Sequence, residues 1–193
     1  GLVARATLKL KERWMDGVAQ DIIEQYQQPK HIKWDESLFI GDAYPAYSWG
    51  VNVVEVEVCP ITYQVKVIGA WSVYDVGKAI DELVVLGQAD GGLVQGMSYA
   101  YLEVMHHKNG RLQQKNMTDY IIPTAADIPR METVLMENPY ALGPYGAKGV
   151  GELTLVGAAP ALALAIEQAI KRKITKIPVT PEYIMELMMH DED

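Results

Sequence analysis

An alternating run of apolar and polar residues is the strongest constraint on the fold of this chain. In residues 51–58, valines alternate with asparagine and glutamate at nearly every position. A strand with one buried face has this two-residue period, because successive side chains point to opposite sides of a sheet. Residues 60–63 begin with proline and suit a turn, and residues 64–76 are again rich in β-branched side chains. The pattern predicts a β-hairpin.

Four other segments have the apolar spacing of helices. They are residues 2–27, which Pro29 ends, residues 87–105, residues 156–171, which carry Pro160 in the first turn, and residues 181–188. Shorter signals are a second hairpin in residues 106–119 around Asn109-Gly110, a candidate strand at residues 131–136 and a turn-rich connection at residues 30–47. We therefore expect an α+β fold, in which hairpins of a mixed or antiparallel sheet pack against helices.

The chain is long enough for one domain with a substantial core. Its 193 residues are 49% hydrophobic and 22% charged, which is ordinary for a globular protein. We expect a single domain. In it, residues 1–43 form an N-terminal helix and connector, residues 44–188 the core, and residues 189–193 a solvated tail.

Charge and cysteine content argue against several functions. The net charge of −8 disfavours nucleic-acid binding, because phosphate contacts need clustered Lys and Arg. Cys59 is the only cysteine, which excludes an internal disulfide and an iron–sulfur cluster held by four thiolates of this chain. No signal peptide is visible, and no run reaches the roughly 18 apolar residues of a membrane span. A cytoplasmic protein is the expectation.

The helix predicted for residues 87–105 carries small residues along one face. Ala89, Gly92, Gly96 and Ala100 recur at steps of three and four. Since a glycine inside a helix costs roughly 1 kcal/mol relative to alanine, this row indicates close approach of another backbone or of a ligand. Tight packing of the helix on the sheet explains the row as well, and on the residues alone it is the better explanation.

Residues 146–152, Gly-Ala-Lys-Gly-Val-Gly-Glu, are the best candidate for a functional site. Their bare backbone lets a bound group approach, and Glu152 follows as a lone carboxylate before a helix. The apolar neighbours Val150, Leu153 and Leu155 predict partial desolvation of Glu152, which would make it a better general base. Alternatively, Glu152 only complements the dipole of the following helix. The residues alone favour neither interpretation.

Other site patterns do not fit the sequence. The glycines of the loop are spaced G-x-x-G-x-G, the reverse of the dinucleotide-binding pattern, and no Lys-Ser or Lys-Thr completes a P-loop. Two of the four histidines, His106 and His107, are adjacent, and adjacent residues do not share a face, so we expect no histidine metal site. Cys59, next to Pro60, has the pattern of a small buried hydrophobic residue.

Residues 146–152 resemble the C-terminal signature of the molybdenum hydroxylases, the xanthine dehydrogenase and aldehyde oxidase family. Four further segments resemble family motifs in the same order. They are residues 44–50 with 54–58, the entry into a hairpin; residues 75–80, D-V-G-x-x-I; residues 87–96, a glycine-rich helix start; and residues 119–124, D-Y-I-I-P-T. The resemblance extends over about residues 44–188, and five ordered matches are far more specific than any single one.

The resemblance implies a molybdopterin cofactor that carries molybdenum, and it implies roles for six residues. Glu152 matches the family's base, which activates a hydroxide on molybdenum for attack on an electron-poor carbon. Gln88 matches a glutamine that hydrogen-bonds the pterin. Backbone contacts along the metal and its dithiolene are implied for the four residues before the base: Lys148, Gly149, Val150 and Gly151.

The sequence also departs from the family. Leu153-Thr154 stand where Pro-Pro is common, and Cys59 and Tyr63 replace an acidic residue and a glycine that are frequent in the first hairpin turn. Family molybdenum subunits are several times longer, and the residues that hold the other side of the cofactor and the substrate are absent here. The implied partners are the rest of the molybdenum subunit, iron–sulfur and flavin (FAD) subunits or domains, and a small-molecule substrate. We expect the isolated chain to be inactive and to retain little molybdopterin.

Three functions follow from these observations. The first is the C-terminal portion of an oxidoreductase that hydroxylates purines, N-heteroaromatics or aldehydes with water as the oxygen source. The second is a non-catalytic structural or assembly lobe of such a complex, and the third is a relative of carbon monoxide dehydrogenase. Glu152 separates the first from the second, because a lobe that only packs has no need of a carboxylate after a bare loop.

Overall fold

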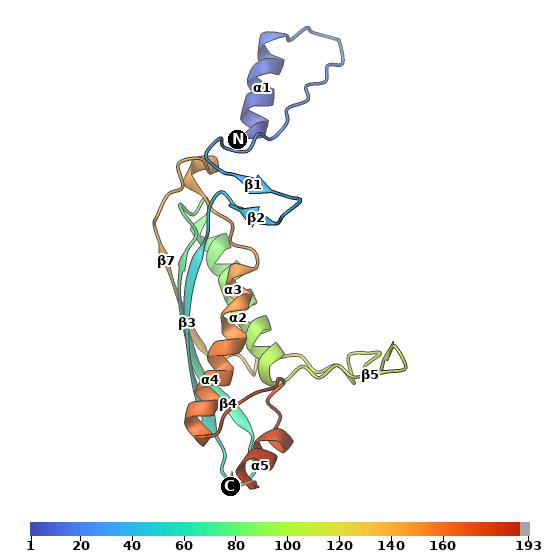
Figure 1. Ribbon diagram of the computed structural model, residues 1–193, viewed down its shortest axis with the longest axis vertical. Coiled ribbons are helices and arrows are strands. Elements are labelled where there is room, and N and C mark those ends of the chain that lie inside the picture. Colours follow the sequence, from blue (N-terminus) through green and yellow to red (C-terminus); the bar gives the residue numbers. More distant parts are fainter. Residues whose placement is uncertain (190–193) are drawn as a thin grey trace.

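The body of the molecule is a three-stranded sheet with helices packed on one face, and an N-terminal helix lies apart from it (Figure 1). The computed structural model describes residues 1–189; the predicted tail, except residue 189, lies outside them. The sheet has the order β3 (Trp49–Val58), β4 (Val65–Asp75), β7 (Arg130–Met136). The packed helices are α2 (Glu82–Tyr101), α3 (Leu153–Val156) and α4 (Ala158–Ile170). The α+β prediction is confirmed.

The predicted hairpin forms two of the three strands of the sheet, with β4 in the centre and β3 at one edge. β3 and β4 pair antiparallel from Trp49↔Asp75 to Val58↔Val65, with one irregularity between Glu55 and Val56. β7 then joins β4 in parallel, so the sheet is mixed. Because β4 and β7 run in the same direction, they end side by side, with Asp75 opposite Met136. The chain segments that follow both strands therefore leave the sheet at one edge.

The main core lies between this sheet and the helices. Leu162 and Ile166 of α4 are fully buried beside Leu93 of α2, and α4 covers the inner face of β3. The last helix, α5 (Pro181–Met189), adds Tyr183 and Ile184 to the same cluster. A burial of this kind contributes roughly 25 cal/mol per Å² of apolar surface, and it fixes α2 and α4 relative to the sheet.

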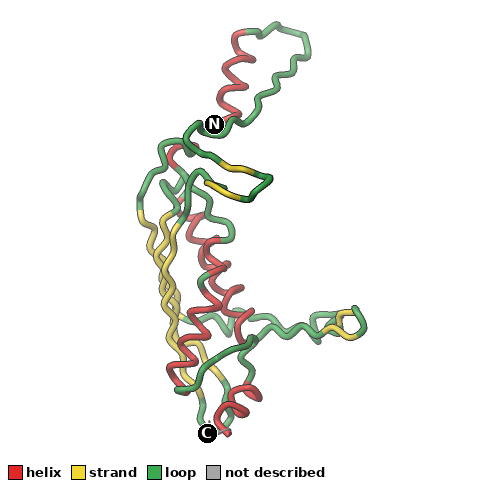
Figure 2. Tube along the Cα trace, viewed as in Figure 1, coloured by secondary structure: helices red, strands yellow, loops and turns green. Residues whose placement is uncertain are grey.

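The N-terminal helix is much shorter than predicted. α1 spans Leu2–Glu12 rather than residues 2–27, and the chain then turns and runs back as loop to a short hairpin, β1 (Trp34–Asp35) with β2 (Ile40–Gly41), before β3 (Figure 2). Glu24 of this returning segment pairs with Arg5 at 3.2 Å and Lys9 at 2.5 Å. No residue of α1 is buried. The amphipathic pattern was misleading because its apolar face meets no core within residues 1–189.

Several other boundaries differ from the prediction by a few residues. α2 begins at Glu82 instead of 87 because the Asp81 side chain caps it, accepting a hydrogen bond from the Val84 amide at 3.1 Å; it ends at Tyr101 instead of 105. The strand at 131–136 is confirmed as β7, and the helix at 156–171 is confirmed, with a break at Gly157 between α3 and α4. The short elements are β1 (Trp34–Asp35) with β2 (Ile40–Gly41), β5 (His107–Lys108) with β6 (Arg111–Leu112) around Asn109-Gly110, and η1 (Pro144–Gly146).

The expectation that no segment is apolar enough to span a membrane needs correction. Among the described residues, Leu153–Ile170 has both the length and the mean hydropathy of a candidate span. The segment is interrupted at Gly157, and Leu162, Ile166 and Ile170 are buried against the rest of the chain. Core packing accounts for these three positions, whereas Val156 and Leu164 are exposed and only 22% of the segment is buried.

The row of small residues on α2 packs as expected, but its glycines meet other helices, whereas Ala89 shares a core cluster with Tyr74 of the sheet. A Cβ atom at Gly92 would lie 2.0 Å from Oγ1 of Thr154, and one at Gly96 would lie 2.5 Å from the backbone oxygen of Leu155. Ala89 and Ala100 are fully buried. The row therefore lets α3 and α4 approach the α2 backbone, and it is explained without a ligand.

We predict opposite effects of alanine at two adjacent glycines of α2. Gly92→Ala should lower the free energy of unfolding by roughly 1–3 kcal/mol, because the new methyl group overlaps Thr154. Gly91→Ala should raise it by about 1 kcal/mol, because a Cβ there meets no described atom within 4 Å and alanine favours the helix. Urea unfolding of both variants measures the difference. Equal effects at the two positions would contradict the packing described here.

Candidate functional site

The loop of residues 146–152 is attached to the edge of the sheet where β4 and β7 end. The amide of Lys148 donates to the Val76 oxygen at 2.8 Å, and the amide of Lys78 donates to the Gly146 oxygen at 2.9 Å. Between them, Gly77 has a φ of +73°, and a Cβ there would lie 2.4 Å from the Gly146 oxygen. Both the backbone conformation and the close approach require glycine at this position.

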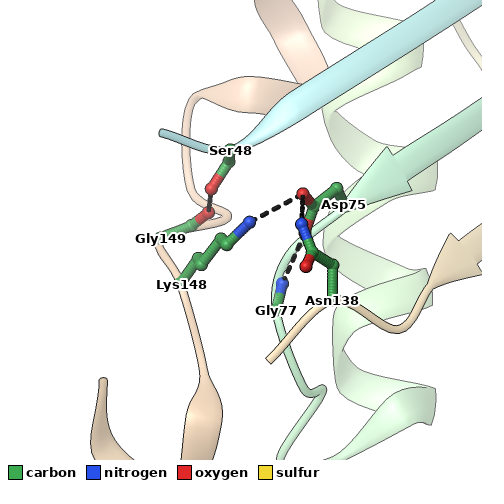
Figure 3. A network of polar contacts seen from close by, with 6 residues as sticks. All are labelled: Ser48, Asp75, Gly77, Asn138, Lys148 and Gly149. Carbon is green, nitrogen blue, oxygen red and sulfur yellow. Dashed lines mark hydrogen bonds and ion pairs between the residues drawn. The ribbon is translucent and has the colours of Figure 1, made fainter. Parts of the chain in front are cut away.

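Next to these backbone bonds, the buried carboxylate of Asp75 accepts hydrogen bonds from three segments of the chain (Figure 3). Oδ2 of Asp75 accepts from Nζ of Lys148 at 2.6 Å and from the side-chain amide of Asn138 at 2.8 Å, and Oδ1 accepts from the Gly77 amide at 3.0 Å. The side chains of Asp75 and Lys148 are only 6% and 9% exposed. Burial raises the pKa of Asp75, but the three donors outweigh it and hold that pKa below the usual value.

Two more side chains hold the second half of the loop. Oγ of Ser48 donates to the Gly149 oxygen at 2.6 Å, and Nε2 of Gln88 donates to the Gly151 oxygen at 3.1 Å. Ser48 precedes β3 and Gln88 lies in α2, so three separate parts of the fold contribute to the path of the loop.

Buried polar groups fix the start of α3, directly after Glu152. The hydroxyl of Tyr74 donates to Oδ1 of Asn52 at 2.6 Å and lies 3.3 Å from the Thr154 oxygen. Oγ1 of Thr154 donates to the Gln88 oxygen at 3.3 Å. Tyr74 and Thr154 are fully buried, and burial raises the pKa of Tyr74, which keeps its hydroxyl protonated as a donor. These contacts hold the start of α3, and with it the backbone next to Glu152, between the sheet and α2.

Glu152 and Gln88, 64 positions apart in the sequence, lie in the wall of one pocket. This open pocket has a volume of about 530 Å³ and is lined by Gly87, Gln88, Gly91, Gly92, Gln95, Gly151, Glu152 and Leu155. The other three predicted site residues, Lys148, Gly149 and Val150, do not line it. Lys148 turns toward Asp75, and Val150 packs on the small core cluster of Tyr74, Val76 and Ala89.

The predicted desolvation of Glu152 is wrong for this chain. Glu152 is solvent-exposed, because its apolar neighbours Val150 and Leu153 turn into the core instead of covering it. The alternative, that Glu152 complements the helix dipole, stays a prediction. Glu152 occupies the position before α3, where a carboxylate interacts favourably with the dipole without a hydrogen bond, and it makes no capping hydrogen bond within the described residues. Glu152 is therefore an exposed acid in the wall of the pocket, and its carboxylate makes no hydrogen bond to the described residues.

Comparison with known proteins identifies the family. The profile of the molybdopterin cofactor-binding domain matches residues 3–129, about two thirds of the chain. The chain belongs to the molybdopterin cofactor-binding domain family. The matched region contains the pocket face of α2 and ends before the loop of residues 146–152, so the roles of the loop residues stay predictions.

Individual relatives agree with this family. The chain is 31% identical over 140 residues to a probable xanthine dehydrogenase polypeptide of Bacillus subtilis; the match covers 72% of this chain and 19% of that protein. It superposes on the aldehyde oxidoreductase from Desulfovibrio gigas with a TM-score of 0.73 and 29% identity, over 83% of this chain and 18% of that one. A Cu,Mo-CO dehydrogenase superposes with a TM-score of 0.69 and 24% identity, over 77% of this chain and 19% of that one. At this identity, the comparison shows a shared fold alone. The chain thus spans about a fifth of the length of these relatives.

Four glycines around the pocket fit a molybdopterin-binding wall. A Cβ at Gly87, Gly91, Gly149 or Gly151 would meet no described atom within 4 Å, and none of the four has a positive φ. Neither packing nor conformation within this chain explains them, although two lie inside α2, where glycine is unfavourable. Three of the four line the pocket. Sequence reasoning missed Gly87 and Gly91 as a pair, although with Gln95 they have the i, i+4, i+8 spacing of one helix face.

The loop also offers backbone donors to a bound group. Within residues 1–189, no group accepts a hydrogen bond from the amides of Gly149, Val150 or Gly151. Successive free amides on a bare loop suit the oxygen, sulfur and phosphate acceptors of a cofactor such as molybdopterin. The free amides of residues 149–151 and the open space beside the glycines therefore both fit molybdopterin.

The Asp75 network predicts an acid-dependent contribution to stability. Because the folded pKa of Asp75 lies below its ordinary value of 3.8, its contribution is complete above the unfolded pKa of about 3.9 and is lost as pH falls through the folded pKa. The unfolding free energies of the wild type and Asp75→Asn should differ by a constant amount above about pH 5 and converge at lower pH. Urea unfolding from pH 7 to pH 2 tests this, and a constant difference down to pH 2 would contradict it.

Proposed function

We propose that this chain forms one wall of the cofactor site in a molybdopterin-dependent hydroxylase, with Glu152 as the catalytic base. The observation that carries the proposal is the pocket that places Glu152 and Gln88 beside three glycines with clear space before them. A base must reach the oxygen nucleophile, and a large planar cofactor must approach the backbone closely. The pocket offers both on one surface.

Each residue of the wall has a defined part in this proposal. Glu152 accepts the proton of the oxygen nucleophile that derives from water, and its lack of structural contacts leaves both oxygens available. Gln88 is held by Gly151 through one N–H and presents its carbonyl oxygen to the pterin. The amides of Gly149, Val150 and Gly151 donate to the cofactor. Bound molybdopterin supplies the two-electron redox chemistry that no side chain provides.

The proposal requires further protein to complete the site. Glu152 is exposed here, so its desolvation must come from the cofactor and from other parts of the molybdenum subunit. The outer face of the sheet, opposite the helices, supports such a partner. Its exposed apolar side chains are Trp49, Val51 and Val53 of β3 with Val134 and Met136 of β7. An apolar sheet face of this extent marks an interaction surface.

The remaining features of the proposal follow from the same reasoning. The rest of the molybdenum subunit, and iron–sulfur and FAD-containing subunits or domains, would carry the substrate contacts and the electrons. The isolated chain would then be inactive. Purines, N-heteroaromatics and aldehydes are the proposed substrates, and the cytoplasm is the proposed location. A role as an assembly lobe is supported by the outer sheet face alone, and it predicts no function for Glu152.

Replacement of Glu152 separates these two roles. In the assembled enzyme, Glu152→Gln should lower kcat by roughly 10²–10⁴-fold, since the amide cannot accept the proton, while the molybdenum content stays at the wild-type level. The matched control is Glu182→Gln, because Glu182 is likewise exposed at the start of a helix but lies outside the pocket. Steady-state kinetics with metal analysis makes the comparison. Full turnover by Glu152→Gln would contradict the base assignment.

Graded substitutions at Gly91 test the cofactor wall. Because open space faces Gly91, larger side chains should fill the pocket without disturbing the fold. Gly91→Ala should reduce bound molybdopterin slightly and Gly91→Leu severely, whereas both variants should unfold at or above the wild-type urea concentration. Cofactor release and fluorescence quantification measure the content. Wild-type cofactor content in Gly91→Leu would show that the cofactor does not approach this face.

A further inference from the structure

We propose that Asp75 is a positioning residue: through Lys148 it sets the place of Glu152, an inference that rests on the proposed role of Glu152. Asp75 is the last residue of β4 and touches neither the pocket nor Glu152. Its buried carboxylate instead binds the side chain of Lys148 at 2.6 Å, four residues before the base. The polar network therefore extends from the rigid sheet into the loop.

The geometry makes Lys148 the fixed point of the loop. Its amide bonds to Val76 and its ammonium to Asp75, so both ends of this residue are attached to the end of β4. The side chain of Lys148 is 9% exposed and that of Asp75 is 6% exposed, so solvent competes little with the pair. A long side chain that spans from loop to sheet and is anchored at both ends restricts the backbone between them.

The segment after Lys148 has weaker attachments. Between Lys148 and Glu152, the described hydrogen bonds to the loop backbone are the single bonds from Ser48, which is half-buried, and from Gln88, which is exposed. The side chain of Val150 adds packing on the small core cluster but no polar contact. A charge-assisted, buried bond is stronger than a neutral bond open to water. Loss of the Asp75–Lys148 pair should therefore release the loop more than loss of either neutral bond.

A purely structural role for the pair predicts a different outcome. A buried ion pair is often replaceable by uncharged groups without loss of stability, whereas removal of one partner leaves an unpaired buried charge. Asp75→Asn and Lys148→Met should therefore each destabilise the chain, and the double variant should recover much of the stability. If the pair serves only stability, activity recovers with it. If it positions the loop, activity does not.

The experiment uses the assembled enzyme with four variants: Asp75→Asn, Lys148→Met, the double variant, and Glu186→Gln as control. The control breaks the exposed Lys176–Glu186 pair, which involves neither the loop nor the outer face of the sheet. Amide hydrogen exchange of peptides that contain residues 146–152 reports the loop directly. Steady-state kinetics separates kcat from KM, and metal analysis reports the molybdenum content.

We expect exchange in residues 146–152 to be at least about tenfold faster in both single variants and in the double variant, and unchanged in the control. We expect kcat of the double variant to stay down by roughly 10²-fold, with KM within about threefold, because a displacement of about 1 Å is enough for such a loss. Wild-type exchange in Asp75→Asn, or recovery of kcat with stability in the double variant, would overturn the inference. Exchange does not depend on the chemistry of Glu152, so failure of the proposed base and failure of the positioning role give different results.

Discussion

The buried pair of Asp75 and Lys148 is the interaction on which the candidate site depends. It forms where the parallel strands β4 and β7 end together, so it links the most rigid part of the fold to the loop that carries Glu152. The carboxylate is satisfied by donors from three segments, which makes burial of two charges tolerable. The sheet therefore determines the path of the loop, and the loop in turn determines the position of the acid.

Two sets of glycines on α2 divide the helix between packing and binding. Gly92 and Gly96 bring α3 and α4 against the helix backbone, and any side chain there would overlap them. Gly87 and Gly91 face open space. Glycine is unfavourable in a helix, and no contact among the described residues explains its presence at these two positions. The first set holds Glu152 near α2, and the second leaves room beside it. Under the proposed function, one helix therefore both supports α3 and α4 and offers a surface to the cofactor.

Local sequence patterns predicted the body of the fold, because the two-residue period of residues 51–58 and the helical period of residues 156–171 both correspond to faces that meet a core. The same reasoning failed for residues 2–27, whose apolar face meets none within the described chain. Local patterns did not predict that Glu152 and Gln88 belong to one site; only the resemblance to the family indicated it. The exposure of Glu152, the Asp75–Lys148 pair and the open face of Gly87 and Gly91 depend on contacts between distant segments, which no local pattern encodes.

The central claim is that the cofactor lies against Gly87, Gly91 and residues 149–152. Hydrogen exchange of the assembled enzyme, compared with and without bound molybdopterin, tests it most directly. Bound cofactor should slow exchange in peptides that cover residues 149–152 and the first half of α2, because it takes the free loop amides as donors and excludes water. Exchange in β5 and β6 should not change. Equal exchange at residues 149–152 in both forms would contradict the account.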